Sequence, residues 1–288
     1  MAIGGRPFTA AAVQMRSGVD PLANFTEAAR LIREAAKAGA SYIQTPEMTN
    51  ILQRGRAALF EAIHPEKSDP SLKAFRGLAA ELGVHLHIGS LALKSGDGRA
   101  VNRAFVIAPD GTTLARYDKI HMFDVDLAGG ESYRESATYD AGDRAVVADL
   151  PEARLGIAIC YDLRFPHLFR ALARGGADIL AIPAAFTRQT GRAHWHVLMR
   201  ARAIENGCFV VAAAQGGRHE DGRETYGHSL IVSPWGEILA EADGDEPGFI
   251  TAAIDPQAVA KARAAIPALA NDREFRLHDS ARLAGAAE

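Results

Sequence analysis

The sequence alternates between short apolar runs and longer amphipathic segments, and this alternation limits the possible folds more than any other feature. Strands are expected at 8–15, 41–45, 84–93, 101–108, 112–117, 155–159, 179–183, 209–214, 229–233 and 249–254, and helices at 24–39, 70–83, 166–174 and 193–206. Hairpin turns join some of these strands and helices separate others. The mixture predicts an α/β layered sandwich with helices on the outside.

The first helix carries its own boundary signals. Asn24 followed by Glu27 predicts a capping box at its start, and Gly39 is the expected stop. Its apolar residues recur with helical spacing, so one face should pack on a sheet. The residues of that face are Phe25, Ala28, Ile32 and Ala35.

Composition favours a single globular enzyme. The chain has 288 residues, of which 48% are hydrophobic, enough for one large core or two domains. No repeat or low-complexity linker divides it, so we expect one domain over residues 1–267 and a C-terminal arm or tail over 268–288. A net charge of −3 does not favour nucleic acid as a partner.

Cysteine usage and hydropathy indicate a cytoplasmic location. Cys160 and Cys208 are the two cysteines, too few for a disulfide framework and typical of a reducing compartment. No apolar run approaches about 18 residues, and the N-terminal residues show no signal pattern. We therefore expect no membrane partner. Cys208 lies in an apolar strand and is expected to be structural.

Cys160 lies where a strand is expected to meet a helix. The apolar run 156–159 leads into it, a polar turn follows, and Pro166 opens the helix. Free backbone N–H groups at such a place favour an anion, and the thiolate is the reactive form of cysteine. Cys160 is therefore a candidate nucleophile, and an inert buried thiol is the alternative.

Two charged residues also follow expected strands. Glu47 lies in Thr45-Pro46-Glu47, and Lys119 comes directly after the strand 112–117 and Asp118. Because open α/β sheets collect catalytic groups at the carboxyl ends of strands, Glu47 is a candidate base and Lys119 a candidate cation. A solvated glutamate and an exposed lysine are the alternatives. A histidine could serve as base instead, but no local signature places one.

Candidate substrate-binding residues surround the same turns. Tyr161 could donate its backbone N–H to an oxyanion, and Arg164 and Arg188 could pair with a substrate carboxylate. Phe186 and Trp195 flank a strand-to-helix turn and could belong to the pocket or to the core.

No metal or other cofactor is expected. His85 and His87 form one histidine pair, and His194 and His196 form another. Neither pair brings a third ligand at a useful spacing.

Three segments resemble the nitrilase superfamily of carbon–nitrogen hydrolases, in the same order. They are Thr45–Glu47, Tyr117–His121 and Ala158–Pro166. The resemblance covers about residues 8–267 and implies an αββα sandwich, four-layered upon dimerisation, with a homodimer or higher homo-oligomer as the assembly. It implies Glu47 as base, Lys119 as cation and Cys160 as nucleophile. The family's second glutamate matches Glu135, with Glu131 less favoured.

Within the superfamily, Cys160-Tyr161-Asp162 resembles the amidase branches. Segments such as Tyr226–Ser229 resemble the branch that acts on deaminated glutathione or α-keto acid ω-amides. His167 departs from the Phe-Pro-Glu that is common among relatives. The implied reaction is hydrolysis of the carboxamide of a small carboxylate-bearing substrate through a thioester. An N-carbamoyl amide hydrolase, a Cys–His hydrolase and a catalytically silent binding protein remain the alternatives.

Overall fold

The computed structural model describes residues 5–96, 98–127 and 130–277. Its helices are α1 (Pro21–Lys37), α2 (Arg56–Ala62), α3 (Pro70–Leu82), α4 (Pro166–Arg174), α5 (Arg188–Asn206) and α6 (Pro256–Ala265), with 3-10 turns at Glu66–Ser68, Glu135–Ala137 and Cys160–Arg164. Its strands are β1 (Phe8–Gln14), β2 (Tyr42–Gln44), β3 (His85–Lys94), β4 (Ala100–Ile107), β5 (Thr113–Asp118), β6 (Asp124–Asp126), β7 (Ser132–Arg134), β8 (Tyr139–Asp140), β9 (Val146–Asp149), β10 (Arg154–Ile157), β11 (Ile179–Ala181), β12 (Phe209–Ala212), β13 (Gly216–Arg218), β14 (Glu224–Tyr226), β15 (Leu230–Val232), β16 (Ile238–Glu241) and β17 (Gly248–Ile254).

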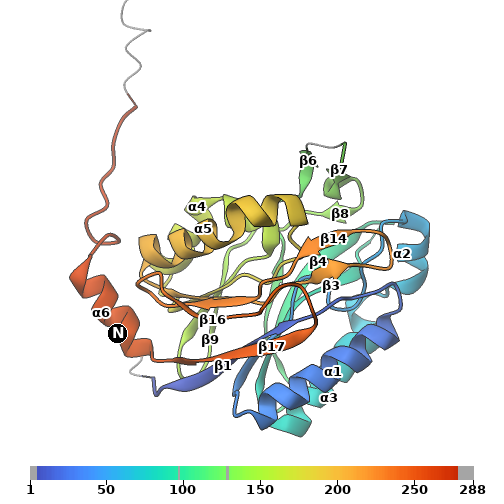
Figure 1. Ribbon diagram of the computed structural model, residues 1–288, viewed down its shortest axis with the longest axis horizontal. Coiled ribbons are helices and arrows are strands. Elements are labelled where there is room, and N and C mark those ends of the chain that lie inside the picture. Colours follow the sequence, from blue (N-terminus) through green and yellow to red (C-terminus); the bar gives the residue numbers. More distant parts are fainter. Residues whose placement is uncertain (1–4, 97, 128–129, 278–288) are drawn as a thin grey trace, which may run out of the picture.

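Two mixed sheets form the centre of the molecule (Figure 1). The first has the order β17-β1-β2-β3-β4-β5, with β8 beside β4, and the second has the order β16-β15-β12-β11-β10-β9. In the first sheet β1, β2 and β3 run parallel, and in the second β10, β11 and β12 do. Antiparallel strands flank each parallel centre. The chain therefore combines βα units with hairpins, as the sequence predicts.

Helices cover the outer face of each sheet. Figure 1 shows α1 and α3 against the first sheet and α4 and α5 against the second. One cluster of buried apolar side chains lies under α1 and α3, and a larger one joins the two sheets and extends under α4 and α5. The four layers of the αββα sandwich are therefore complete in one chain. This corrects the expectation that four layers form upon dimerisation.

The first helix begins earlier than its predicted capping box. Asp20 is the N-cap, with its carboxylate accepting from the Leu22 N–H at 2.9 Å, and Pro21 occupies the first turn, where its missing N–H costs nothing. Asn24 is buried instead, and its amide bridges Gly18 to the carbonyl of Asn50. The capping box was therefore wrong. The predicted face is confirmed, since Ala28, Ile32 and Ala35 are buried and Phe25 packs beside them.

The polar segment 120–143 contains β6, β7, β8 and the 3-10 turn Glu135–Ala137, none of which its sequence pattern predicts. The helices α2 and α6 and several short edge strands were not expected either, and α5 begins at Arg188 rather than near residue 193. These elements are short or polar, so their periodicity gives little signal.

Residues 266–277 contain no helix or strand. Leu269 still packs against the larger apolar cluster, and Asp272 pairs with Arg174 of α4. Figure 1 shows the chain running away from the sheets at its C-terminal end. The rest of the predicted arm, 278–288, lies outside the described residues, so the domain boundary at 267 stays a prediction. In the described part of the chain, no helix combines the length and the apolar character needed to span a bilayer.

Candidate active site

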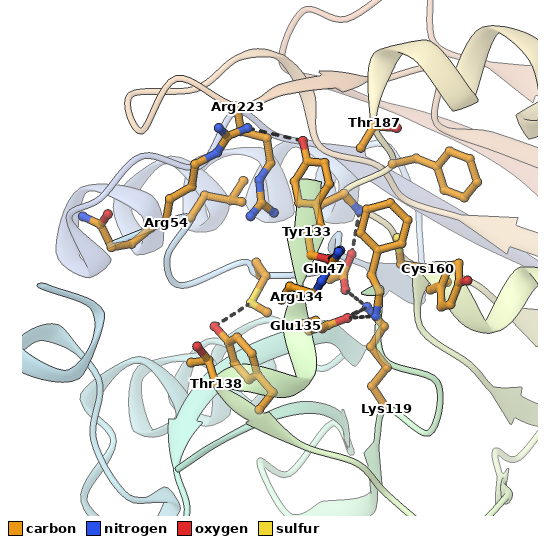
Figure 2. Close-up of a pocket in the computed structure, with 18 of the residues that line it drawn as sticks. Glu47, Arg54, Lys119, Tyr133, Arg134, Glu135, Thr138, Cys160, Thr187 and Arg223 are labelled. Carbon is orange, nitrogen blue, oxygen red and sulfur yellow. Dashed lines mark hydrogen bonds and ion pairs between the residues drawn. The ribbon is translucent and has the colours of Figure 1, made fainter. Parts of the chain in front are cut away.

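A cavity of about 260 Å³ lies where strand ends of both sheets meet. Glu47 reaches it from the turn after β2, Lys119 from the end of β5, and Cys160 from the turn after β10. The three residues are only 4%, 2% and 7% exposed. Side chains that are far apart in the sequence therefore line one cavity (Figure 2).

Lys119 is held between two glutamates. Its ammonium donates to Glu47 Oε1 at 2.9 Å and to Glu135 at 2.8 and 3.0 Å. The second glutamate beside the lysine is thus Glu135. Glu131 is exposed, and its carboxylate accepts from the Tyr133 hydroxyl at 3.2 Å. Because an ammonium has three hydrogens, these contacts engage its full donor capacity.

Two further groups hold the carboxylates of Glu47 and Glu135 in place, and neither was predicted from the sequence. The side-chain amide of Asn102 donates to Glu47 Oε1 at 2.9 Å and to Glu135 Oε1 at 3.2 Å. The backbone N–H of Ala185 donates to Glu47 Oε2 at 2.8 Å. A polar residue inside the apolar strand β4 is a signal that could have identified Asn102. Nothing in the local sequence identifies a backbone donor such as Ala185.

Cys160 has a strained backbone. Its φ is +48°, a value that residues with a side chain rarely adopt, and its N–H donates to the carbonyl of Pro183 at 2.9 Å. Met48, beside Glu47, also has a positive φ of +56°. Cys160 begins a 3-10 turn, whereas α4 begins only at Pro166. The expectation that the thiol lies at the mouth of that helix is therefore corrected.

Asp162 holds the cysteine turn in place. It is fully buried, and its carboxylate accepts from the Ile159 N–H at 2.8 Å and from the Tyr117 hydroxyl at 2.7 Å. The turn is thereby tied to β5, which also carries Lys119.

The charges of the site determine which groups are ionised. Burial alone would raise the pKa of Glu47, but the charge of Lys119 and hydrogen bonds from Lys119, Cys160 and Asn102 outweigh it and hold that pKa below its ordinary value. Burial lowers the pKa of Lys119, yet Glu135 and Glu47 raise it well above the usual range. Both groups are therefore charged at neutral pH.

The Cys160 thiol behaves in the opposite way. Burial and the charge of Glu47 raise its pKa well above the ordinary value, although Lys119 pulls it down. A cation beside a thiol would by itself favour the thiolate, but the charge of Lys119 does not lower the pKa of Cys160 below its ordinary value here. The resting site holds a protonated thiol beside an ionised carboxylate, the arrangement in which the carboxylate can accept the proton as sulfur attacks.

Of the three aromatic residues that the sequence suggests for substrate binding, two line the cavity and one belongs to the core. Tyr161 and Phe186 line the cavity. Trp195 is fully buried behind Phe186, with ring centroids 5.3 Å apart, and its indole N–H donates to the carbonyl of His228 at 2.8 Å. It is not among the described residues that line the cavity.

The predicted arginines have partners elsewhere. Arg164 donates to His194 Nδ1 at 3.1 Å, and Arg188 pairs with Asp245 at 2.5 Å. Neither belongs to the described lining of the cavity. Four other arginines line it, namely Arg54, Arg56, Arg134 and Arg223.

A histidine cluster outside the cavity could hold a metal ion. His196 Nε2 and His228 Nδ1 lie 2.7 and 2.9 Å from Glu241 Oε1. The three ligand atoms lie within 4.8 Å of one another. The predicted pair His194 and His196 does not make this cluster, because the partners of His196 come from other elements. Among the described residues, no such group lies in the cavity.

Comparisons with known proteins show which family the chain resembles in sequence and fold. The carbon–nitrogen hydrolase family model matches residues 9–264. A deaminated glutathione amidase of Synechocystis sp. is 42% identical, with 92% of this chain and 97% of the relative covered. An omega-amidase of Xenopus laevis is 38% identical over 85% of this chain and 87% of its own. The crystal structure of the NitFhit protein of C. elegans superposes with a TM-score of 0.88 at 33% identity, covering 96% of this chain and 69% of that one.

The sequence segments that suggested the nitrilase superfamily therefore lie within a match that spans almost the whole described chain. The superposition on the C. elegans structure covers 96% of the chain, so the chain shares the fold of that relative. The chain belongs to the carbon–nitrogen hydrolase family, and it is a hydrolase of carbon–nitrogen bonds other than peptide bonds.

Proposed function

We propose that the chain is a cysteine-dependent amidase that converts the terminal carboxamide of a small carboxylate-bearing molecule to an acid and ammonia. The observation that supports it is a protonated thiol beside an ionised, lysine-paired Glu47, both nearly inaccessible to solvent, in one cavity. The names of relatives favour two substrates, deaminated glutathione and an α-keto acid ω-amide.

The first half of the proposed reaction forms a thioester. Glu47 takes the proton of Cys160 while sulfur attacks the amide carbon, and the carbonyl oxygen becomes an oxyanion. The charge of Lys119 and the backbone N–H of Tyr161 stabilise this oxygen, and losing one such donor costs about 3 kcal/mol. Glu47 then passes its proton to the amide nitrogen, the C–N bond breaks, and ammonia leaves.

The second half releases the acid. Glu47 removes a proton from water while the oxygen attacks the thioester. The C–S bond then breaks, the acid is released, and Glu47 returns the proton to the Cys160 sulfur, which restores the thiol and the carboxylate. Glu135 is a positioning residue in this scheme. It accepts two hydrogen bonds from Lys119 and one from the Phe123 N–H at 2.7 Å, so the ammonium stays directed at the reacting groups.

Ammonia release from α-ketoglutaramate and from deaminated glutathione tests the proposal. Cys160→Ala should abolish it, and mass spectrometry of rapidly quenched wild-type enzyme should show an acyl adduct on Cys160. Cys208→Ala is the matched control, because Cys208 is a second buried free thiol that lies outside the described cavity lining. Full activity in Cys160→Ala would contradict the mechanism. Carbon dioxide released together with ammonia from carbamoyl compounds would instead indicate an N-carbamoyl amide hydrolase.

We also propose a cytoplasmic homodimer. Val197 and Ile204 lie two helical turns apart on α5 and are 69% and 50% exposed, and nearby Trp235 is 56% exposed. Apolar side chains grouped on a surface in this way are typical of interfaces. Light scattering of Val197→Glu should report a smaller mass than the wild type, and an unchanged mass would contradict this interface.

A further inference from the structure

The arginines of the cavity wall fall into two pairs. Arg56 and Arg134 are anchored by the protein itself. Arg56 donates to the carbonyls of Ala137 at 2.9 Å and Gly98 at 2.7 Å, and Arg134 pairs with Asp126 at 2.8 Å. These contacts explain both side chains as parts of the structure.

Arg54 and Arg223 are not explained in this way. Neither forms an ion pair with a carboxylate of the described residues. Arg54 donates to the Tyr133 hydroxyl at 3.3 Å, and the buried Nε atom of Arg223 has no hydrogen-bond partner among the residues that the structure describes. A buried donor without an acceptor is costly, and such donors are rare in folded proteins. An acceptor from outside the chain would remove that cost.

The two guanidinium groups converge on one ring. Their central carbons lie 5.6 and 5.7 Å from the centroid of Tyr133. Two acidic side chains face this group. Glu131 accepts from the Tyr133 hydroxyl, and Asp221 accepts from the backbone N–H of Arg223, yet neither pairs with a guanidinium. The positive charge therefore remains available.

This group lies in the same cavity as Cys160 but away from the reacting residues. In the view of Figure 2, Arg54, Arg223 and Tyr133 lie on the far side of Glu47 from Lys119. Apolar side chains complete the wall of the cavity and suit the methylene groups of a chain-like substrate. They are Met48, Ile51, Leu52 and Leu59.

We propose that Arg54 and Arg223 bind a carboxylate at the end of the substrate remote from the scissile amide, with Tyr133 as the wall between them. Guanidinium groups match a carboxylate through paired hydrogen bonds, and the match supplies the acceptor that Arg223 lacks. The substrate class is a linear carboxamide with a free carboxylate at its other end. This inference rests on the proposed amidase function and adds the residues that select the substrate.

Matched pairs of amides test it. Glutaramate, adipamate and pimelamate carry the distal carboxylate, and pentanamide, hexanamide and heptanamide lack it. The ratio of kcat/KM for charged over neutral amide should fall about 10- to 100-fold in Arg54→Gln and in Arg223→Gln, mainly through KM. Arg223→Lys should restore part of the ratio, since it keeps the charge. Arg218→Gln is the control, because Arg218 is exposed on the neighbouring hairpin and does not line the cavity.

A binding measurement separates this inference from the amidase function. Calorimetry of adipamate with Cys160→Ala, and with the same variant also carrying Arg54→Gln or Arg223→Gln, needs no turnover. Weaker binding in the arginine variants supports the subsite even if no amide is hydrolysed, in which case only the proposed function fails. An unchanged charged-to-neutral ratio, or equal binding of adipamate in all variants, would overturn the subsite.

Discussion

The charged groups at the two ends of the cavity differ in whether the protein itself pairs them. At the reacting end, Lys119 donates to Glu47 Oε1 and to both oxygens of Glu135, and Ala185 donates to Glu47 Oε2, the oxygen that Lys119 does not contact. Asn102 adds a second donor to Glu47 Oε1 and to Glu135 Oε1. At the other end, Arg54 and Arg223 face the cavity with no ion-pairing carboxylate among the described residues. One set of charges is complete in the folded chain, and the other is incomplete.

This difference indicates that one end of the cavity carries out the reaction and the other selects the substrate. A closed network fixes its groups before substrate arrives, so little reorganisation is needed when charge develops in the transition state. An incomplete network is completed by the ligand, and the gain from completing it appears as affinity and selectivity. The comparison predicts that substitutions at the reacting end affect stability, protonation and kcat together. Substitutions at the arginine end should affect substrate selectivity, measured as the ratio of kcat/KM for charged over neutral amides.

Lys119→Met should have the largest effect. It leaves two buried carboxylates without their cation, so kcat/KM should fall by at least about 10³-fold and the free energy of unfolding by about 3–5 kcal/mol. Burial would then raise the pKa of Glu47, and a carboxyl with a raised folded-state pKa loses its stabilising contribution as pH increases. Urea unfolding of this variant should therefore show stability that falls with rising pH.

Arg54→Met provides the contrast for that measurement. The Arg54 guanidinium has no ion pair with any described residue, so the unfolding free energy of this variant should stay within about 0.5 kcal/mol of the wild type. Equal destabilisation by the two substitutions would show that the two ends do not differ as the comparison requires.

Glu47→Gln should separate reactivity of the thiol from turnover. Loss of the base should lower kcat by about 10²–10⁴-fold. The pKa of the Cys160 thiol should fall at the same time, because the charge of Glu47 no longer raises it while Lys119 still lowers it. The pH dependence of alkylation by iodoacetamide measures this shift, with Glu61→Gln, an exposed glutamate of α2, as control. A Cys160 pKa that rises in Glu47→Gln would contradict this account of the site.

Much of the fold could be predicted because its core elements carry strong periodic signals. The buried strands β1, β3, β10 and β12 and the helix α3 lie within two residues of their expected bounds. The failures occur where tertiary contacts override local signals. Asn24 looks like a cap but bridges two loops, and Glu135, in the polar segment 120–143, accepts hydrogen bonds from the distant Lys119.

The candidate site divides in the same way. Glu47, Lys119 and Cys160 could be identified because each follows an expected strand and lies in a segment that resembles a known family. Their catalytic roles remain predictions. Arg54 and Arg223 could not be distinguished from surface arginines, because the sequence does not show whether an arginine forms an ion pair in the folded chain. Arg164 and Arg188 were attractive by position in the sequence, but they pair with His194 and Asp245.

Asn102→Ala should have a smaller effect than the charged substitutions. It removes one donor from each glutamate, and a hydrogen bond to a charged group is worth about 1.5–3 kcal/mol. We expect kcat to fall about 10- to 100-fold with little change in KM, because the amide acts on the carboxylates and not on the distal substrate carboxylate. A change confined to KM would place Asn102 in substrate binding and would weaken the separation of the two ends.

The smallest effect should come from pH. Glu47 stays ionised below its ordinary pKa, Lys119 stays charged well above its own, and the Cys160 thiol stays protonated, so none of the three titrates near neutrality. The kcat/KM for adipamate should therefore be nearly constant from about pH 6 to about pH 8. A Cys–His hydrolase would instead lose activity about tenfold per pH unit below the pKa of its histidine. An acid limb of that kind would mean that a base other than Glu47 drives the reaction, and the closed network at the reacting end would then need another explanation.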